Sequence, residues 1–347
     1  MMRILSYPEA IREAIEQEML CDPSVILLGQ GVDDPKGTLG TTKGLAQKFG
    51  KRRVFDTPLS EDAMVGVAIG ASLAGLRPIN VHIRMDFLLL AMNQIINMAA
   101  KMRYMYGGKF HVPIVIRCII GKSWGQGPQH SQSLYPLFMN IPGLKIVLPS
   151  LPFDVKGCMV QAIRDNNPVI FIEHRLLYYQ RGYVPEKRYS VPFGRARILS
   201  KGSDITLVGI SQMALECLRA KRYLKDAGIN AEVIDPISLS PLDINTIKKS
   251  VKKTGSLIVV DNGWITSAAG AEIITQLLEN RVLNNILVHR MGFAFTPCPT
   301  TPALEEHFYP NAKGIASHAY RMLYPRKKQW APTGKLKIEE MEFKGPF

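Results

Sequence analysis

The sequence predicts an α/β protein with two open parallel sheets, each in a domain of its own. Three observations favour this class. The 347 residues are enough for two domains that each bury a hydrophobic core. Short runs of Val, Ile and Leu alternate with stretches of helical periodicity, a pattern typical of parallel sheets covered by helices. The pattern breaks where Tyr, Arg, Gly and Pro gather. We therefore expect a first domain over 1–180, a linker over 181–200, a second domain over 201–328 and a tail over 329–347.

The first domain opens with a capping-box pattern from Ser6 to Glu9, which predicts a helix through about Met19. The predicted strands that follow cover 25–28, 53–55, 78–82, 112–117, 145–148 and 169–172. The predicted helices that separate them cover 43–49, 61–75, 87–103 and 154–164. Functional side chains are expected in the loops at the carboxyl ends of the strands, because parallel sheets bind ligands there.

The second domain repeats the alternation of strands and helices. Its predicted strands cover 205–210, 231–234, 256–260 and 286–289. Its predicted helices cover about 213–227, 242–251 and 268–279. The tail over 329–347 shows no such pattern and is expected to be partly disordered.

The stretch Phe55-Asp-Thr-Pro-Leu-Ser-Glu61 joins a short strand to a helix of small residues. Pro58 predicts a turn, and Ser60 is a candidate N-cap that places Glu61 in the first helical turn. Two internal glycines cost the helix about 2 kcal/mol relative to alanine, so close packing against another element is expected. From spacing alone, the favoured interpretation is that Glu61 only complements the helix dipole, and a role as a functional acid group is the alternative.

The composition excludes several classes of protein. The formal net charge is +14, but the basic residues are neither interleaved with aromatic residues nor part of a nucleic-acid-binding motif. No apolar run is long enough to cross a membrane, and no targeting segment is visible. The five cysteines lack metal-ligand spacing. We expect a cytoplasmic protein with reduced thiols that binds neither nucleic acid nor a membrane; the basic surface leaves an acidic partner or an anionic substrate open.

Several ordered blocks carry a resemblance to a known family. They are Phe55-Asp-Thr-Pro-Leu-Ser-Glu61, Gly66-Val-Ala-Ile-Gly70, Gly75-Leu-Arg-Pro78, Gln129-His-Ser-Gln132, Pro142-Gly-Leu-Lys145 and Ile163-Arg-Asp-Asn-Asn-Pro168. From about residue 4 to 323 the chain resembles the beta subunit of the thiamine-diphosphate-dependent decarboxylase component of 2-oxo acid dehydrogenases, a group that belongs with the transketolases. The resemblance implies a pyrimidine-binding domain followed by a transketolase C-terminal-like domain.

The resemblance also implies roles for four residues. The carboxyl group of Glu61 would hydrogen-bond the aminopyrimidine N1′ of thiamine diphosphate, which is the electron sink for decarboxylation of a 2-oxo acid. Phe87 would stack on the pyrimidine, and Leu59 would help to bury Glu61 and raise its pKa. His130, after a glycine-rich loop, would contact the substrate or acyl acceptor and move protons. Without the resemblance, Phe87 can as well be an ordinary core residue, and a lone histidine such as His130 is more often a structural hydrogen-bonding residue.

A structural potassium site is implied at Ile114, Ala162, Ile163, Asp165 and Asn167. Backbone carbonyl groups with one carboxylate and one amide suit a hard monovalent cation. The run from Asp165 to Pro168 is also a common turn sequence, so a purely structural role is open.

One motif of the resembled family is missing. No Gly-Asp-Gly, the start of the family's diphosphate and magnesium site, occurs in the chain. The resemblance therefore implies that a separate alpha subunit holds Mg²⁺ and the diphosphate in an α2β2 heterotetramer, with beta–beta self-association. A lipoyl acyltransferase is the expected acyl acceptor, with a 2-oxo acid as substrate.

Two residues depart from the pattern of the family. Gln30 stands where a glutamate that is thought to relay protons is usual, and Leu90 replaces a polar residue near the pyrimidine. These changes leave a second enzyme reading open, a split transketolase or acyloin synthase that passes the thiamine-bound unit to an aldehyde. A scaffold without catalytic activity is a third reading, which the presence of Glu61, Phe87 and His130 together disfavours.

Overall fold

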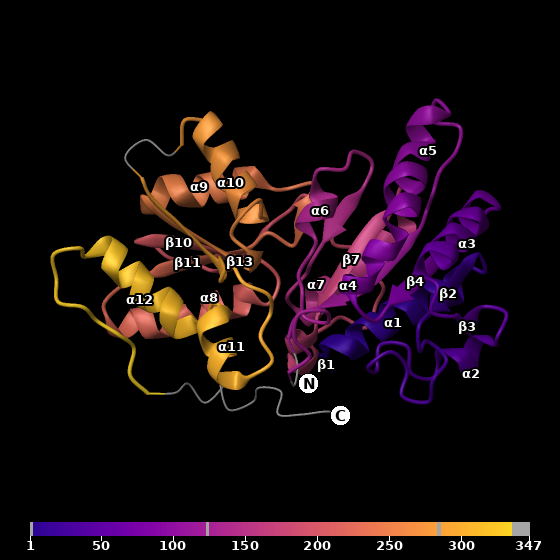
Figure 1. Ribbon diagram of the computed structural model, residues 1–347, viewed down its shortest axis with the longest axis horizontal. Helices are drawn as coiled ribbons and strands as arrows, with labels where there is room; N and C mark the ends of the chain where they lie inside the picture. Colours follow the sequence, from indigo (N-terminus) through magenta and orange to yellow (C-terminus); the bar gives the residue numbers. More distant parts are fainter. Residues whose placement is uncertain (1–2, 123–124, 283–285, 335–347) are drawn as a thin grey trace. The chain divides into compact units, whose positions relative to one another are not determined.

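The computed structural model describes residues 3–122, 125–282 and 286–334 and divides into two compact units (Figure 1). The first unit comprises Met1–Ile120 and Leu137–Phe193, and the second comprises Gly121–Pro136 and Gly194–Phe347. Each unit contains a mostly parallel sheet flanked by helices, which confirms the predicted α/β class. The boundaries at 180 and 201 stay predictions, and residues 335–347 of the predicted tail lie outside the described residues.

The main sheet of the first unit is parallel, with strand order β6-β7-β5-β4-β2-β3. Its strands are β2 (Val25–Gly29), β3 (Val54–Asp56), β4 (Arg77–His82), β5 (Val115–Ile120), β6 (Lys145–Val147) and β7 (Val169–His174). Gly29 is paired with Asp56 on one side and Val81 on the other, so the carboxyl ends of three strands meet at one edge. The predicted strand at 112–117 begins instead at Val115, because Pro113 has no N–H to donate.

The helices of the first unit flank this sheet, and α1 packs against α7 while α3 packs against β4. They are α1 (Tyr7–Cys21), α2 (Leu45–Phe49), α3 (Glu61–Leu73), α4 (Met85–Leu88), α5 (Ala100–Met105) and α7 (Pro152–Arg164). The short α6 (Pro136–Met139) begins at the last residue of a second-unit segment and continues into the first unit. A capping box formed by Ser6 and Glu9 starts α1, as predicted.

The uninterrupted helix predicted over 87–103 is wrong. A 3-10 turn at Leu89–Ala91 and a π-helical segment at Gln94–Ala99 separate α4 from α5. The buried residues Ala91, Ile95 and Ala99 recur every four residues, which is wider than the 3.6-residue turn of an α-helix. The π segment keeps them on one buried face.

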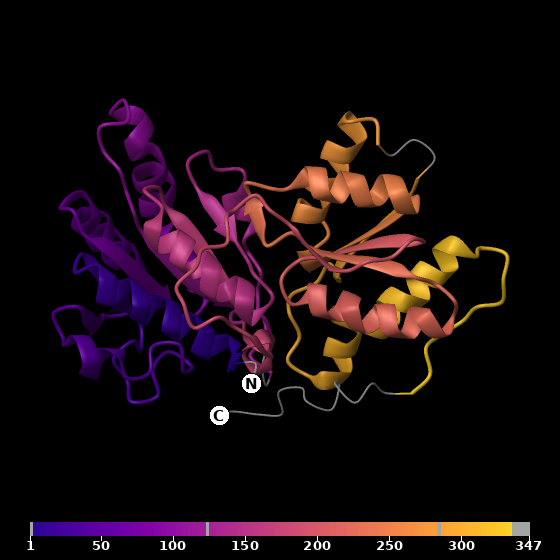
Figure 2. The ribbon, with the colours of Figure 1, turned by 180° about the vertical axis from the view of Figure 1, so that it is seen from behind.

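The second unit has a sheet with strand order β14-β13-β10-β11-β9. Its strands are β9 (Arg197–Ser200), β10 (Ile205–Gly209), β11 (Ala231–Asp235), β13 (Ser256–Trp264) and β14 (Leu287–Phe293), and β12 (Ser238–Ser240) is a further short strand. Only β9 runs antiparallel among the strands of this sheet that the structure describes. In both views α9 and α10 cover one face of the sheet, and α8 and α12 cover the other (Figures 1 and 2).

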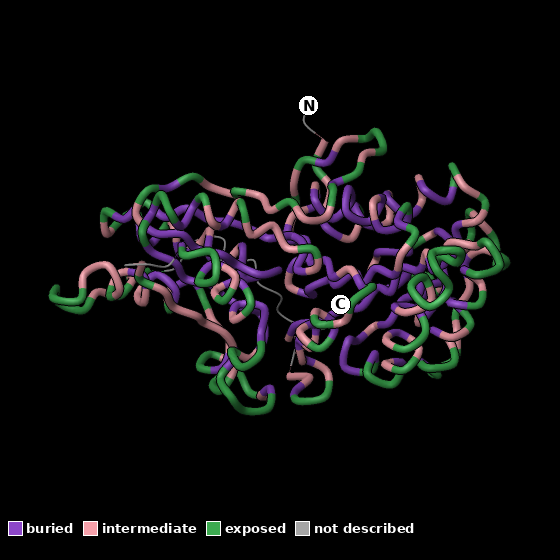
Figure 3. Tube along the Cα trace, turned by 90° about the horizontal axis from the view of Figure 1, so that it is seen from above, coloured by how far each residue is buried: buried purple, intermediate pink, exposed green. Residues whose placement is uncertain are grey.

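The helices of the second unit are α8 (Met213–Asp226), α9 (Ile244–Thr254), α10 (Ala269–Glu279), α11 (Pro302–Phe308) and α12 (Ala312–Leu323). The core lies where α8 and α12 meet β10, β11 and β13. Buried residues follow the strands of each sheet, and exposed residues lie mainly at the periphery of each unit (Figure 3). None of the helices in the described part of the chain is both long and apolar enough to cross a lipid bilayer.

The stretch 181–200, predicted as a linker, carries strands at both ends. At its start, β8 (Arg181–Tyr183) pairs antiparallel with β1 (Ile4–Ser6) in the first unit. At its end, β9 is the edge strand beside β11 in the second unit. Both strands depend on partners far away in the sequence, so local composition alone indicates only irregular structure.

Candidate functional site

Glu61 lies at the edge of the first sheet where the carboxyl ends of β2, β3 and β4 meet. The turn after β3 places it as the first residue of α3, as the sequence predicts. Ser60 occupies the N-cap position, but its side chain makes no capping hydrogen bond. The Glu61 side chain is 7% exposed, so the carboxylate is largely removed from water within this chain.

The amide of Gln30 holds the Glu61 carboxylate in place. Its Nε2 donates a hydrogen bond to Glu61 Oε1 at 2.9 Å, and its Oε1 accepts one from the backbone N of Ile83 at 3.2 Å. The backbone N of Gln30 also donates to the carbonyl oxygen of Val81 at 3.0 Å. An amide can donate and accept at once, so it joins the ends of β2 and β4 to the start of α3.

Two buried polar side chains that the sequence analysis did not single out lie on β4. Asn80 and His82 are 1% and 2% exposed, and their side-chain nitrogen and oxygen atoms have no hydrogen-bond partner among the described residues. Burial lowers the pKa of His82 to about 4, although the negative charge of Glu61 acts in the opposite direction. The imidazole is therefore neutral at pH 7. The sequence contains an indication of these two buried polar residues, since both interrupt an otherwise apolar predicted strand.

The two apolar residues predicted to bind the cofactor lie on the surface of the first unit. Leu59 is 79% exposed and lies in the turn before α3, and Phe87 is 38% exposed and lies in α4. The role of Leu59 in burying Glu61 stays a prediction, because the side chain of Leu59 is mostly exposed in this chain by itself. Leu59 and Phe87 leave apolar surface that a flat heterocycle can cover.

His130 belongs to the second unit, in the glycine-rich segment that precedes α6. Gly125 and Gly127 have positive φ angles and pack against Thr300 so closely that a Cβ atom on either would clash with it. The carbonyl oxygen of Gly127 accepts a hydrogen bond from the backbone N of His130 at 3.4 Å. This segment packs tightly on the loop that contains Thr300. The packing fixes the backbone on which His130 lies.

A cavity of about 500 Å³ in the second unit is lined partly by Gln129 and Gln132, which flank His130 in the sequence. It is lined by Pro128, Gln129, Gln132, Trp264, Phe295, Thr296, Pro297 and Cys298. The indole Nε1 of Trp264 donates a hydrogen bond to the carbonyl oxygen of Thr296 at 2.9 Å, which fixes the ring in the wall. Aromatic surface with two amide side chains suits a partly apolar ligand.

The five residues of the predicted potassium site do come together around the end of α7. Arg77 Nη1 donates hydrogen bonds to the carbonyl oxygens of Ile163 and Asp165 at 3.0 and 3.1 Å. Lys145 forms an ion pair with the Asp165 carboxylate. The carbonyl oxygens of Ile114 and Ala162 accept backbone hydrogen bonds of their own.

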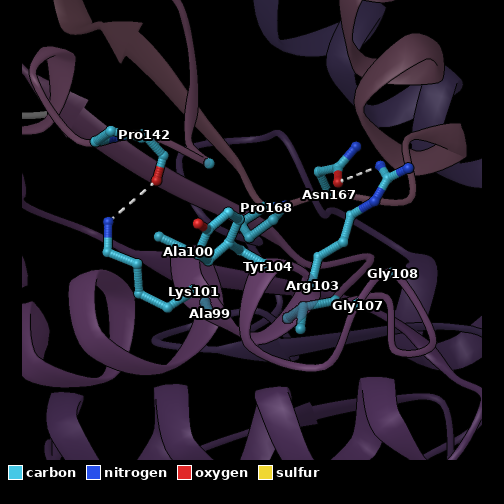
Figure 4. A pocket seen from close by; sticks show the side chains of 12 residues that line it. Ala99, Ala100, Lys101, Arg103, Tyr104, Gly107, Gly108, Pro142, Asn167 and Pro168 are labelled. Atoms are coloured by element: carbon cyan, nitrogen blue, oxygen red, sulfur yellow. Dashed lines mark hydrogen bonds between the residues drawn. The ribbon is translucent and has the colours of Figure 1, made fainter.

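Figure 4 shows the cavity of about 820 Å³ beside this cluster, where Arg103 Nη1 donates to Asn167 Oδ1 at 2.9 Å. Three cationic side chains thus already bind these oxygens. The arrangement does not favour a further cation, and the potassium site stays a prediction. In addition, no group of three or more His, Cys, Asp or Glu residues that could hold a metal ion occurs within 3–122, 125–282 and 286–334.

Comparison with known proteins gives the family. The model of the transketolase pyrimidine-binding domain matches residues 4–180, and that of the transketolase C-terminal domain matches residues 194–315. The chain is 45% identical over 334 residues to the beta subunit of acetoin:2,6-dichlorophenolindophenol oxidoreductase from Cupriavidus necator, covering 93% of this chain and 98% of that protein. The chain belongs to the transketolase-like family that contains these beta subunits.

Other members of this beta-subunit family show the same relation. The chain is 41% identical over 336 residues to the corresponding subunit of Bacillus subtilis, covering 93% of this chain and 98% of that protein. It is 47% identical over 272 residues to the pyruvate dehydrogenase E1 component subunit beta of Gracilaria tenuistipitata var. liui, covering 78% and 84%. A solved structure described as a split-gene transketolase, inactive beta4 tetramer, shares the fold at a TM-score of 0.77 and 22% identity, covering 93% of this chain and all of that one.

Proposed function

We propose that this chain is the beta subunit of a thiamine-diphosphate-dependent 2-oxo acid dehydrogenase that decarboxylates its substrate and passes the acyl group to a lipoyl carrier. The observation that carries the proposal is the buried Glu61 carboxylate, held by Gln30 at the carboxyl edge of a parallel sheet. Relatives that are named as the beta subunits of an acetoin:2,6-dichlorophenolindophenol oxidoreductase and of the pyruvate dehydrogenase E1 component support it.

The groups around Glu61 fit the aminopyrimidine half of thiamine diphosphate. One carboxylate oxygen is engaged by Gln30, and Glu61 Oε2 is left for a ring nitrogen. Phe87 offers an exposed aromatic face, and Leu59 offers an exposed aliphatic group. A carboxylate that accepts a hydrogen bond, together with aromatic and aliphatic surface, suits a flat heterocycle with a protonated ring nitrogen.

Thiamine diphosphate, when bound, supplies the electron sink for cleavage of the bond between a carboxylate and the adjacent carbonyl carbon. Glu61 would hold or release a proton at N1′ of the pyrimidine, and Gln30 would keep the carboxyl group oriented. Phe87 would exclude water from one face of the ring. His130 would move a proton at the acyl acceptor.

The proposed assembly is an α2β2 heterotetramer with beta–beta contacts, in which the alpha subunit holds Mg²⁺ and the diphosphate. The lack of a Gly-Asp-Gly in the sequence supports a separate source for that half of the site. Potassium is not part of this proposal, because Arg77 and Lys145 already supply positive charge to the oxygens predicted to bind it.

The test is the substitution Glu61→Gln in the complex with the alpha subunit. We expect it to leave folding nearly unchanged and to lower turnover by about two to four orders of magnitude, as loss of a general acid–base group does. The measurement is deuterium exchange at C2 of bound thiamine diphosphate. Asp62→Asn is the matched control, since Asp62 is the exposed next residue of the same helix. Exchange at the rate of the unmodified complex in Glu61→Gln would refute the proposal.

A further inference from the structure

The loop that carries His130 is anchored to the second unit on both sides of the histidine. Before the histidine, the glycine-rich part of the loop packs against Thr300. After it, the hydroxyl group of Tyr135 donates a hydrogen bond to Asp261 Oδ1, and both side chains are buried. Residues 125–135, all of which the structure describes, form neither a helix nor a strand. The conformation of the loop therefore depends on these two anchors.

The second anchor is built on the carboxyl end of β13. Asp261, Asn262 and Gly263 are consecutive residues of this strand. The side-chain amide of Asn262 donates to Ser133 Oγ at 3.5 Å. A Cβ atom on Gly263 would lie 3.4 Å from the carbonyl oxygen of Ser133, so the loop backbone lies directly on the strand. Three consecutive residues of one strand thus contact the loop just after the histidine.

Asp261 connects this anchor to a helix as well. Its Oδ2 accepts a hydrogen bond from the backbone N of Gly270 at 2.9 Å, in the first turn of α10. Burial raises the pKa of Tyr135 well above its usual value, so the hydroxyl group keeps its proton near neutral pH and stays the donor. At a buried site water cannot replace a lost partner, so removal of this hydroxyl group is expected to release the loop from the strand.

A fixed loop matters for a group that transfers protons. A proton donor must come within hydrogen-bond reach of the atom that it serves. A displacement of about 1 Å can lower a rate by about 100-fold. His130 follows Gly127 by three residues and precedes Tyr135 by five, so no part of the loop is far from an anchor.

We propose that the hydrogen bond from Tyr135 to Asp261 holds the loop in the conformation in which His130 reaches the acyl acceptor. Tyr135 is fully buried and acts through His130, so it is a positioning residue. The inference rests on the proposed function, in which His130 moves a proton at the acceptor and Glu61 serves the earlier step at the cofactor. Loss of the Tyr135 hydroxyl group should therefore impair transfer to the acceptor and spare decarboxylation.

The first experiment measures backbone hydrogen exchange by mass spectrometry in the complex with the alpha subunit. Tyr135→Phe keeps the buried ring and removes only the hydroxyl group. Exchange in peptides that cover 126–134 should rise by about tenfold, while other peptides of the second unit stay unchanged. Ser133→Ala, which removes the contact with Asn262, should act in the same direction and replaces Tyr135→Phe if that variant does not fold.

Tyr223→Phe is the matched control, because Tyr223 is a buried tyrosine of the same unit that lies in α8. It should leave exchange over 126–134 unchanged. If Tyr135→Phe also leaves this exchange unchanged, the inference is overturned, whatever the activity of the complex.

The second experiment compares two reactions of the same complex, acylation of a cognate lipoyl domain and decarboxylation with an artificial electron acceptor. Tyr135→Phe should slow acylation by about tenfold and change decarboxylation by less than about twofold. In the His130→Ala background, Tyr135→Phe should slow acylation no further, because no imidazole is left to position. Additive effects of the two substitutions, or equal loss of both reactions, would mean that Tyr135 is only structural and would overturn the inference.

The outcomes separate the inference from the function on which it rests. Normal acylation in Tyr135→Phe would overturn the inference, while loss of C2 deuterium exchange in Glu61→Gln would leave the proposed function standing. Normal C2 exchange in Glu61→Gln would refute the proposed function and, with it, the part of the inference that concerns His130.

Discussion

At the scale of single residues, Gln30 decides how Glu61 is held. A carboxamide donates to the carboxylate and accepts from Ile83 at the same time, which an ionised glutamate at the same position cannot do. The resembled family usually has glutamate at the position of Gln30. The replacement by glutamine therefore changes how the Glu61 carboxylate is held. It keeps Glu61 oriented without placing a second negative charge beside it.

The substitution Gln30→Glu should make stability depend on pH. It places two carboxyl groups about 2.9 Å apart, so the pKa of one must rise well above its unfolded value. A raised pKa in the folded state contributes stability at low pH, and this stability is lost as the pH increases through that pKa. Each tenfold change in the acid dissociation constant corresponds to about 1.4 kcal/mol. We expect the Tm difference from the unmodified protein to grow between pH 5 and pH 8.

Gln30→Leu is the control, and its Tm difference from the unmodified protein should be independent of pH. A Tm difference for Gln30→Glu that is equally independent of pH would contradict the prediction.

At the scale of elements, the sequence predicts what is local. The runs of Val, Ile and Leu predict most strands of both sheets, and the turn at Pro58 predicts the start of α3 at Glu61. The π segment at Gln94–Ala99 could not be predicted, because its apolar residues also fit an ordinary helix within the error of a periodicity count.

The features of the candidate site that the sequence does not predict share one property. The interaction of Gln30 with Glu61 and the burial of Asn80 and His82 depend on which strand lies beside which. Strand order follows from contacts between distant parts of the chain, which residue patterns do not encode locally. The resemblance supplied Glu61 but not the groups that hold it.

The cluster at the end of α7 should depend on Arg77 for its stability. Arg77 donates to the carbonyl oxygens of Ile163 and Asp165 and to Asn166 Oδ1. Arg77→Ala should lower the free energy of unfolding by about 3 kcal/mol, because it leaves acceptors unpaired. Urea unfolding measures this, with Arg52→Ala at an exposed arginine as the control.

The same variant tests the potassium site. If the oxygens can hold potassium, KCl should restore the stability of Arg77→Ala more than NaCl does. Equal stability in both salts would argue against a potassium site at these residues.

The exposed face of α3 should be required for assembly with the alpha subunit. Ala63, Val67 and Gly70 form a stripe of small residues at helical spacing, and all three are exposed. A Cβ atom on Gly70 would meet nothing within 4 Å, so Gly70→Leu should leave the chain itself folded. We expect it to abolish or strongly weaken copurification with the alpha subunit. Lys249→Leu on α9 is the control; normal assembly of Gly70→Leu would exclude this face as the interface.

At the scale of the whole molecule, the chain contributes candidate functional groups from both units. Glu61 and Phe87 belong to the first unit, and His130 belongs to the second, although it precedes the last strand of the first unit in the sequence. Contacts between residues far apart in the sequence explain why His130 belongs to the second unit. Tyr135 hydrogen-bonds Asp261 of β13, and Lys122 forms an ion pair with Glu305 of α11 at 3.2 Å, so both residues pack with the second unit.

His130→Ala should separate two partial reactions of the complex. We expect it to reduce acylation of a cognate lipoyl domain by about 100-fold, because a proton donor at the acceptor is lost. Decarboxylation that is measured with an artificial electron acceptor should fall much less. His111→Ala is the control for a histidine away from the site. Absence of lipoyl acylation in the unmodified complex, together with efficient ketol formation from an aldehyde, would instead favour the acyloin synthase reading.

Trp264 gives the second unit an optical reporter of its cavity. The chain has three tryptophans, and Trp264 is one of the residues that line the cavity of about 500 Å³ in this unit. Its hydrogen bond to Thr296 fixes the ring, so its fluorescence emission depends on what fills that space. A molecule that displaces water from the cavity should shift this emission towards the blue. Candidate acceptors can therefore be ranked by titration, before any turnover assay is established and without knowledge of the 2-oxo acid.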